Sequence, residues 1–458
     1  MKVLLVSTYE LGHQPLQLAR AAAALLATGH EVRAVDVSTA PLEVVAVDWA
    51  DGVALSVPMH TAARMALRVA ETIRSRRPGL PLCFYGLYAA NGIDAASSSA
   101  ATVIAGEYET GLVAWAGGQD PGAAVQLARV EGRLPARHLL APLDRYARLE
   151  TAGEERPVAS VEASRGCSHR CRHCPVPVVY DGRVRVVTEA AVVADVDQVV
   201  AAGARHVTFS DPDFLNAPHH ARRVIAAVHQ RHPSLSFDCT IKVEHVLRHP
   251  DILPELAATG CAFVVSAFES VNETVLGYLD KGHTVDDASL AVTMLREHGI
   301  EVRPSWLPFT PWTTVDDLAD LVDFVIAHDL VANVDPVQYT VRLLVPEGSL
   351  LVGQPCLAAH LGSYDATRLG WTWSHPDPAI DELQLELAAL VEARVDQPAA
   401  STFVEIAERI GARAAPRKQH PAPGERSRGP YGARPRLSEA WFCCSEPTAA
   451  QLGPLAEG

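Results

Sequence analysis

The segment Arg165–Pro175, RGCSHRCRHCP, places three cysteines close together with the spacing C-x3-C-x2-C. The three are Cys167, Cys171 and Cys174. Three thiolates at this spacing can ligate three irons of a [4Fe-4S] cube and leave the fourth iron open to an exogenous ligand. A structural zinc site would instead close its tetrahedron with a fourth Cys or His at a regular spacing, and His169 and His173 lie inside the loop, where closure is awkward. The segment therefore predicts an iron–sulfur cluster, around which we expect the chain to be organised.

The composition of the chain sets its class and its compartment. Its 458 residues, 48% of them hydrophobic, suffice for two or three domains at ~150 residues each. No run of about 18 uncharged apolar residues occurs, and Met1–Ser7 lacks the charged region and cleavage site of a signal peptide. Nine cysteines, an odd number with three of them clustered, fit a reducing compartment better than a disulfide framework. These features predict a cytoplasmic protein without a membrane partner.

The charge balance argues against nucleic acid as a partner. The formal net charge is −15, whereas nucleic-acid binders gain affinity by neutralising phosphates with Lys and Arg. We therefore expect no nucleic-acid partner, and a small molecule or a small peptide as the substrate.

The first 118 residues alternate strand-length apolar runs with helical patterns. The strand candidates are Val3–Val6, Glu31–Val35, Gly52–Val57, Leu82–Tyr85 and Thr102–Ala105, and the helix candidates are Pro15–Ala27, Thr61–Ser75 and Ala89–Ser97. This βα repeat predicts an α/β domain with a doubly wound parallel sheet, Rossmann-like or flavodoxin-like, whose ligands bind at the carboxyl ends of the strands. No G-x-G-x-x-G follows the first strand, so the nicotinamide and flavin fingerprint is missing.

A second βα repeat begins at Val158 and carries the cysteine segment after its first strand. Its strand candidates are Val158–Ala163, His206–Ser210, Leu235–Ile241, Ala262–Phe268, Glu301–Leu307 and Val337–Leu344, and its helix candidates are Thr188–Ala202, Pro218–Gln230, Asp286–His298 and Thr314–His328. Six such units predict a partial (β/α)6 barrel of the TIM type, with reactive groups on the carboxyl-end loops. We accordingly expect a Rossmann-like domain at 1–118, a linker at 119–157, the partial barrel at 158–350, a helical extension and flexible linker at 351–436, and a helical or irregular tail at 437–458.

The cysteine segment resembles the cluster motif of the radical S-adenosylmethionine (SAM) enzymes. In that family the methionyl amine and carboxylate of SAM chelate the open iron. The resemblance implies a [4Fe-4S] cluster and SAM as cofactors, and reductive cleavage of SAM to a 5′-deoxyadenosyl radical that acts on a small substrate. It also implies an electron donor such as ferredoxin or flavodoxin.

Polar residues at the ends of the later strands are the candidates for binding SAM. The family binds the SAM amino group with the segment after its second strand, where Ser210, Asp211 and Asp213 here provide the acceptors that an ammonium needs. The two glycines usual in that segment are absent, which leaves backbone and side-chain contacts as alternatives. The fourth-strand region resembles that of methylthiotransferases and cobalamin-dependent members, which makes Glu269 a candidate for the ribose hydroxyls. Lys242 is a candidate for the SAM carboxylate or a substrate anion, and for both residues a surface salt bridge is the alternative.

The first domain resembles the cobalamin-binding domain that precedes the radical SAM core in a large subgroup of the superfamily. It departs from that pattern, because the D-x-H-x-x-G segment that supplies a lower-axial histidine in many cobalamin proteins is absent. Neither His13 nor His60 takes that role by spacing. Cobalamin is thus a further candidate cofactor and cobalamin-dependent methyl transfer an alternative reaction, while a degenerate domain that serves as a lid or docking surface is the other interpretation.

The end of the chain, Leu437–Pro447, carries two adjacent cysteines, Cys443 and Cys444, after a Pro-, Arg- and Gly-rich stretch at Ala415–Pro435 that we expect to be a mobile linker. Adjacent cysteines form a disulfide only with strain, so such a pair is typical of redox or metal chemistry. This ending resembles the radical SAM family named for its CUAEP/CCAEP tail, although Ser445 here replaces the alanine. We predict that Cys443 and Cys444 are catalytic residues at the active site.

A hypothesis of another class is a non-catalytic iron–sulfur electron carrier or metal-binding scaffold. Such a protein would not need a six-unit barrel with polar strand ends around its cluster. Reduced protein that never forms 5′-deoxyadenosine from SAM would favour this hypothesis.

Overall fold

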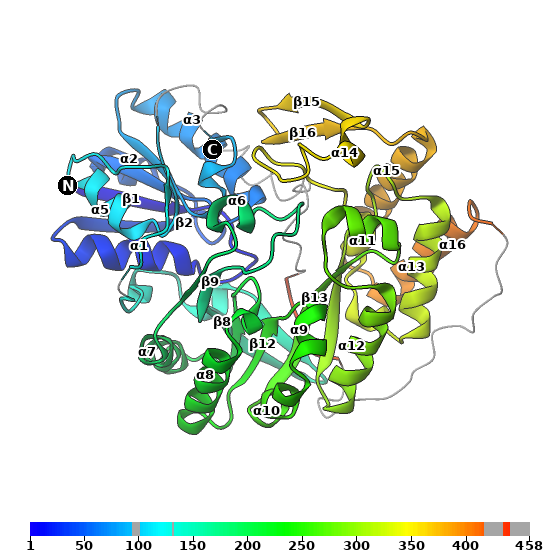
Figure 1. The fold of residues 1–458 in the computed structure, drawn as a ribbon. Helices are drawn as coiled ribbons and strands as arrows, with labels where there is room; N and C mark the ends of the chain where they lie inside the picture. Colours follow the sequence, from blue (N-terminus) through cyan, green and yellow to red (C-terminus); the bar gives the residue numbers. More distant parts are fainter. Residues whose placement is uncertain (94–100, 131, 416–433, 440–458) are drawn as a thin grey trace.

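The computed structural model describes residues 1–93, 101–130, 132–415 and 434–439. Two α/β halves, each built on its own sheet, lie side by side (Figure 1). Across the described part of the chain, no helix combines the length and the apolar character needed to span a bilayer.

The N-terminal half is a six-stranded parallel sheet in the order β2-β1-β3-β4-β5-β6. Its strands are β1 (Lys2–Ser7), β2 (Glu31–Asp36), β3 (Gly52–Ser56), β4 (Leu82–Tyr85), β5 (Thr102–Gly106) and β6 (Val125–Gln126), and its helices are α1 (Leu16–Ala27), α2 (Val44–Trp49), α3 (His60–Arg76) and α5 (Glu109–Ala116). Along β1, Leu4 and Val6 pack with α2 and α3, whereas Val3 and Leu5 pack with α1 and α5. Helices therefore cover both faces, and the predicted parallel sheet is confirmed.

The second half is a seven-stranded sheet in the order β14-β13-β12-β11-β8-β7-β17, curled into a half-barrel. The five strands from β8 to β14 are parallel, whereas β7 and β17 add to one edge in antiparallel fashion. The strands are β7 (Arg148–Thr151), β8 (Glu154–Val161), β11 (His206–Phe209), β12 (Ser236–Thr240), β13 (Cys261–Glu269), β14 (Glu301–Trp306) and β17 (Arg436–Leu437).

Helices cover the outer face of this half-barrel and form one continuous core with the sheet. They are α7 (Glu189–Ala201), α8 (Pro218–Arg231), α9 (Val243–Arg248), α10 (Leu253–Ala258), α12 (Val285–Glu297) and α13 (Val315–Ala327), with α11 (Glu273–Leu279) after β13. Thr314 begins α13 as predicted: its hydroxyl accepts a hydrogen bond from Asp317 N at 3.2 Å, and the Asp317 carboxylate accepts one from Thr314 N at 2.7 Å. Such a capping box satisfies two backbone donors that the helix leaves free.

The predicted sixth strand, Val337–Leu344, is wrong. Pro336–Thr340 forms a 3-10 turn, and among the described residues the strand order continues beyond β14 only as an isolated bridge between Phe309 and Arg342. Pro336 fixes the first turn and has no backbone N–H for a ladder. The side chain of Gln338 instead accepts the hydrogen bond of Trp306 N, at 2.9 Å. In the helix predicted at Ala89–Ser97, residues Leu87–Ala90 form a 3-10 turn, and residues 94–100 lie outside the described residues.

Segments between and after the two sheets join the halves. The stretch 119–157, expected to be a linker, includes β7, the start of β8 and the 3-10 turn Arg137–Leu139. Within that turn the buried Arg137 guanidinium donates to Asp195, at 2.7 and 2.8 Å, and to Gln14 Oε1, at 3.0 Å. Because Gln14 precedes α1 and Asp195 lies on α7, the arginine holds the two halves together.

A C-terminal extension follows the half-barrel and packs on both halves. It comprises α14 (Pro355–Ala358), the hairpin β15 (Leu361–Asp365) and β16 (Gly370–Trp373), α15 (Pro378–Ala393) and α16 (Ala399–Gly411). The hairpin lies next to α3 (Figure 1), where Nε2 of His60 is 2.6 Å from the carbonyl of Arg368. Of the predicted mobile linker Ala415–Pro435, residues 416–433 lie outside the described residues.

Candidate active site

A cavity of about 330 Å³ lies where the carboxyl-end loops of the two sheets meet. Loops after β1 and β3 line it from the N-terminal half, and the cysteine loop with the ends of β11, β12, β13 and β14 lines it from the half-barrel. Its volume falls within the roughly 300–1,000 Å³ of small-molecule sites. Because folds of both types carry their functional groups at these strand ends, the cavity is the candidate active site.

The three cysteines line one end of this cavity. Cys167 and Cys171 are buried, and Cys174 is half-buried. Gly166 precedes the first of them with φ +75°, and a Cβ there would stand 2.2 Å from the carbonyl of Arg183, so only glycine fits the turn. Burial raises the pKa of the Cys167 thiol to about 11. A bound metal reverses this effect, because metals bind the thiolate.

A two-stranded ribbon and a short helix flank the cysteine loop: β9 (Ser164–Gly166) pairs with β10 (Val184–Val186), and α6 (Val176–Tyr180) follows the last cysteine. Ser168, in the cysteine loop, is bound by Asn216, which follows β11. Oδ1 of Asn216 accepts hydrogen bonds from Ser168 N, at 3.0 Å, and from Ser168 Oγ, at 2.7 Å. Asn216 therefore holds the backbone beside the first cysteine. Its signal in the sequence was its place in the polar run that follows β11.

Both carboxylate oxygens of Asp211 are used inside the protein. Oδ1 accepts a hydrogen bond from Ala163 N, at 2.8 Å, and Oδ2 accepts one from Ser164 Oγ, at 2.5 Å. Burial raises the pKa of Asp211 to about 7 against the effect of these bonds. The side chain thus braces the start of the cysteine loop, and its contact with SAM stays a prediction.

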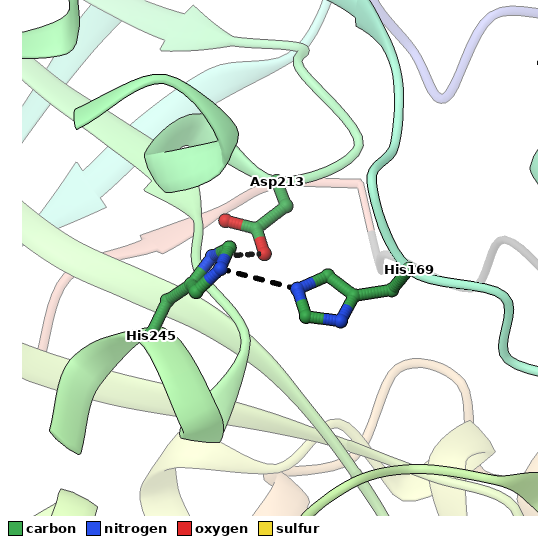
Figure 2. A group of neighbouring side chains, drawn as sticks. All are labelled: His169, Asp213 and His245. Atoms are coloured by element: carbon green, nitrogen blue, oxygen red, sulfur yellow. Dashed lines mark hydrogen bonds and ion pairs between the residues drawn. The ribbon is translucent and has the colours of Figure 1, made fainter. Parts of the chain in front are cut away.

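His169, Asp213 and His245 come from three segments and meet beside the cavity (Figure 2). Nε2 of His169 lies 3.1 Å from Nε2 of His245. Nδ1 of His245 lies 2.8 Å from Oδ2 of Asp213, at ion-pair distance but without the alignment of a hydrogen bond. One ligand atom from each residue lies within 4.8 Å of the other two, a spacing that a cation can bridge.

Lys242 completes this group from the end of β12. Its Nζ lies 3.0 Å from Nδ1 of His169 and 3.3 Å from Oε2 of Glu244. Burial, reinforced by the charge of Lys242, lowers the pKa of His169 to about 4, so its ring is neutral at pH 7. An ammonium only donates hydrogen bonds, so Nδ1 of His169 accepts and its proton lies on Nε2, facing His245. Lys242 is buried and makes this ion pair with the half-buried Glu244, and its contact with SAM stays a prediction.

Glu269 ties the end of β13 to the cysteine loop. Its Oε1 accepts hydrogen bonds from His173 Nε2, at 3.1 Å, and from Lys281 Nζ, at 3.0 Å. Burial opposes ionisation, but Lys281 and His173 lower the pKa of Glu269 well below its usual range. Burial likewise opposes the charge of Lys281, whereas Glu269, Cys171 and Cys174 raise its pKa. This lysine therefore stands close to two of the three thiols.

Arg165, at the entrance to the cysteine loop, binds carboxylates of both halves. Its guanidinium donates to Glu107, at 3.0 Å, and to Glu109, at 2.5 Å, both of which follow β5. It also donates to Glu162 beside β8, at 2.9 Å, and Tyr180 Oη donates to Glu107 at 3.0 Å. The N-terminal half is thus fastened directly to the loop that carries the cysteines.

The N-terminal half gives the cavity an apolar floor and two polar residues, the buried His13 and the half-buried Glu10. The apolar lining residues of its strand ends are Leu11, Leu16, Pro58, Met59 and Leu87. His13 also lines the cavity, and burial lowers its pKa to about 4, which leaves a neutral imidazole. Glu10 lines it as well, and its Oε2 is buried without a hydrogen-bond partner among the described residues. His60 is instead engaged with the Arg368 carbonyl, outside the lining set.

Eight predicted site residues come together around the cavity. They are Cys167, Cys171, Cys174, Ser210, Asp211, Asp213, Lys242 and Glu269. Cys443 and Cys444 lie outside the described residues, but the chain just before them is described, and Leu437 and Glu439 line the same cavity. Sequence reasoning missed Asn216 and His245, whose only signal was their position shortly after the second and third barrel strands.

Residues 161–325 match the model of the radical SAM superfamily. This span contains the cysteine loop and the five residues predicted to bind SAM. This span is a radical SAM domain, and enzymes of that superfamily use a [4Fe-4S] cluster and SAM.

Similar proteins extend this picture to the fold of both halves. A hopanoid C-2 methylase from Rhodopseudomonas palustris (strain TIE-1) is 23% identical over 150 residues, which span 32% of this chain and only 28% of that protein. The cobalamin-dependent SAM radical enzyme OxsB, with aqua-cobalamin and SAM bound, superposes with a TM-score of 0.66 at 14% identity, over 86% of this chain and 67% of that one. The radical SAM methyltransferase TsrM from Kitasatospora setae, with cobalamin and a [4Fe-4S] cluster bound, superposes with a TM-score of 0.63 at 16% identity, over 88% of this chain and 90% of that one.

Proposed function

We propose that the protein cleaves SAM reductively and directs the resulting 5′-deoxyadenosyl radical at a small substrate held in the cavity between its halves. The observation that carries this proposal is the position of the three thiols. Cys167, Cys171 and Cys174, within a radical SAM domain, line a cavity of about 330 Å³ that has room for a ligand.

The cysteine loop fits a cluster in its chemistry and its surroundings. When bound, a [4Fe-4S] cluster supplies the single electron that cleaves SAM. Cys167, Cys171 and Cys174 would hold three of its irons, as three thiolates on a short loop do. Lys281 stands beside two of these cysteines and would offset the negative charge of the ligated thiolates. A one-electron donor such as ferredoxin or flavodoxin would complete the system, and an oxygen-labile cluster suits the cytoplasm.

We assign the predicted SAM residues to two tasks. Ser210, exposed on the cavity wall, would accept a hydrogen bond from the SAM ammonium; Lys242 would meet its carboxylate; and Glu269 would meet the ribose hydroxyls. Asp211 and Asp213 already bind neighbours through their carboxylates, so they would act by positioning the loops.

Anaerobic reconstitution tests the proposal directly. The reduced protein is expected to bind iron and to convert SAM to 5′-deoxyadenosine, which mass spectrometry identifies. A protein with a complete cluster that never forms 5′-deoxyadenosine, even with cell extract as a source of substrates, would instead be an electron carrier or scaffold.

Cobalamin-dependent methyl transfer is the second candidate, favoured by the N-terminal sheet placed against the radical SAM half. The apolar floor formed by Leu11, Pro58, Met59 and Leu87 suits the flat face of a corrin, and these residues would hold it. Reconstitution with hydroxocobalamin is expected to give a corrinoid absorption spectrum that survives gel filtration. Loss of the corrinoid on gel filtration would leave the N-terminal half as a docking or closing domain.

The tail extends the proposal to the end of the chain. We infer from the CCSEP sequence that the protein belongs with the CUAEP/CCAEP-tail radical SAM proteins, and that Cys443 and Cys444 react with the substrate radical or its product. The support is the position of Glu439 on the cavity wall.

A further inference from the structure

An arginine lies deep in the half-barrel, away from the cysteine loop. Arg303 pairs with Val265 across β14 and β13, and Val265 pairs with Thr240 across β13 and β12. Residues directly opposite one another in a sheet share a face, and all three line the cavity. Arg303 stands three residues before the end of β14, so it lies roughly 10 Å below the rim where the SAM candidates are found.

Only one of the two terminal nitrogens of the Arg303 guanidinium has a hydrogen-bond partner among the described residues. The residue is 8% exposed, and its Nη2 donates to Oδ2 of Asp335 at 3.0 Å. Its Nη1 is buried with no hydrogen-bond partner among the described residues. An arginine cannot shed its proton, and a buried donor without an acceptor is costly and rare in native proteins. The site therefore has room for an acceptor that the described residues do not provide.

The opposite wall also presents polar atoms without partners. From the N-terminal half, Oε2 of Glu10 and Nδ1 of His13 are buried and unpaired in the described structure, and both residues line the cavity. Burial raises the pKa of Glu10 to about 8, so its carboxyl is protonated at pH 7 and can donate a hydrogen bond. Polar atoms without a partner among the described residues thus line the cavity from both halves.

We propose that the deep end of the cavity, around Arg303, binds a carboxylate group of the substrate, with Nη1 of Arg303 as its anchor. The inference rests on the proposed function, because it places the substrate in the cavity where the SAM-derived radical forms. A carboxylate is a charged acceptor, and a hydrogen bond between a guanidinium N–H and a carboxylate is stronger than one between neutral groups. A dianion such as phosphate is disfavoured, because Asp335 and Asp238 stand on the same walls.

The test measures the preference of the site for acids over amides. The full chain, reconstituted anaerobically and loaded with SAM, is titrated by calorimetry with phenylacetate, hexanoate and their primary amides, and with inorganic phosphate. We expect each acid to bind at least tenfold more tightly than its amide, and Arg303→Met to abolish that preference. Arg296→Met is the matched control. Arg296 forms an ion pair with Glu301, which is on β14 like Arg303, but Arg296 does not line the cavity.

Equal affinity for acid and amide, absence of binding by both acids, tighter binding of phosphate, or a preference that survives Arg303→Met would each overturn the inference. Should Arg303→Met fail to fold because Asp335 is left unpaired, the double variant Arg303→Met/Asp335→Leu removes both partners and answers the same question. Iron content and 5′-deoxyadenosine formation are measured in the same samples. Their absence contradicts the proposed function, whereas their presence without the acid preference contradicts this inference alone.

Discussion

Tyr9 Oη donates a 2.6 Å hydrogen bond to Oε1 of Glu439, across 430 positions of the sequence. The glutamate is held from a second side, because β17, directly before it, pairs with β7, and Ser438 N donates to the Arg148 carbonyl at 2.8 Å. The base of the C-terminal tail is therefore fixed at the cavity wall.

The cysteine pair follows this anchor closely in the sequence. Cys443 lies four positions after Glu439, a separation of at most about 14 Å in extended chain. We predict that the double variant Cys443→Ala/Cys444→Ala keeps its melting temperature, iron content and SAM cleavage but does not form the final product. Comparison of product profiles by mass spectrometry checks this, with Cys356→Ser as the control. Normal product formation, or unfolding, would make the tail incidental or structural.

Removal of one cluster cysteine should abolish the metal centre. In Cys171→Ala, two thiolates remain for a cube that needs three, so we expect loss of most of the iron and of the cluster absorption. Cys356→Ser is the control, because this half-buried cysteine on α14 lies outside the cavity lining. A Cys171→Ala protein with a full cluster spectrum would contradict the ligand assignment.

Glu269→Gln should lower both the free energy of unfolding and the affinity for the cluster. The change leaves Lys281 buried without its counter-ion, and breaking one partner of a buried ion pair typically costs about 3–5 kcal/mol. We expect a loss of that order in the free energy of unfolding and a lower iron content. Glu155→Gln is the matched control: its partner Arg148 is exposed, and such a surface pair contributes about 1 kcal/mol or less. Equal effects of the two variants would argue against a buried triad.

Glu10 should make stability depend on pH. Burial, reinforced by the charge of Asp36, raises the pKa of Glu10 to about 8 in the folded protein, against the backbone hydrogen bond from Gln17, which lowers it. The folded state then binds more protons than the unfolded state between pH 4.5 and pH 8, so this contribution is fully present below that window and is lost as the pH rises through it. The expected slope is about 1.4 kcal/mol per pH unit.

Denaturant unfolding of wild type and Glu10→Gln at pH 5, 6.5 and 8 measures this slope. The difference in unfolding free energy should move in favour of the glutamine variant as the pH rises, because glutamine has no proton to lose. A difference that stays constant over the three values would show that Glu10 is ionised like an exposed carboxylate.

Regular patterns in the sequence predicted most of the strands that position the site. All five strand candidates of the N-terminal half correspond to β1 to β5, because buried parallel strands are short apolar runs between helical patterns. The failure at Val337–Leu344 has a local cause: an apolar run looks like a strand, but Pro336 starts a turn there and a side-chain bond to Trp306 N replaces the ladder.

Interactions between distant segments could not be predicted in the same way. Residue types and strand-end positions were enough to predict that the cysteines and the five SAM candidates lie at one cavity. They did not show that Asp211 binds Ser164, or that Glu269 binds His173 and Lys281. Those pairings depend on how the cysteine loop folds back over the strand ends. Likewise, the unpaired Nη1 of Arg303 appears only when its neighbours are placed.

Arg165 couples the ordering of the cysteine loop to the contact between the two halves. Arg165 lies two residues before the first cysteine. Its guanidinium pairs with Glu107 and Glu109 of the N-terminal half and with Glu162 of the other half. By thermodynamic linkage, whatever orders the loop stabilises those ion pairs, and whatever tightens the pairs favours the ordered loop by the same free energy. Binding of iron and docking of the N-terminal half should therefore favour each other, so that removal of the metal should also weaken the contact between the two halves.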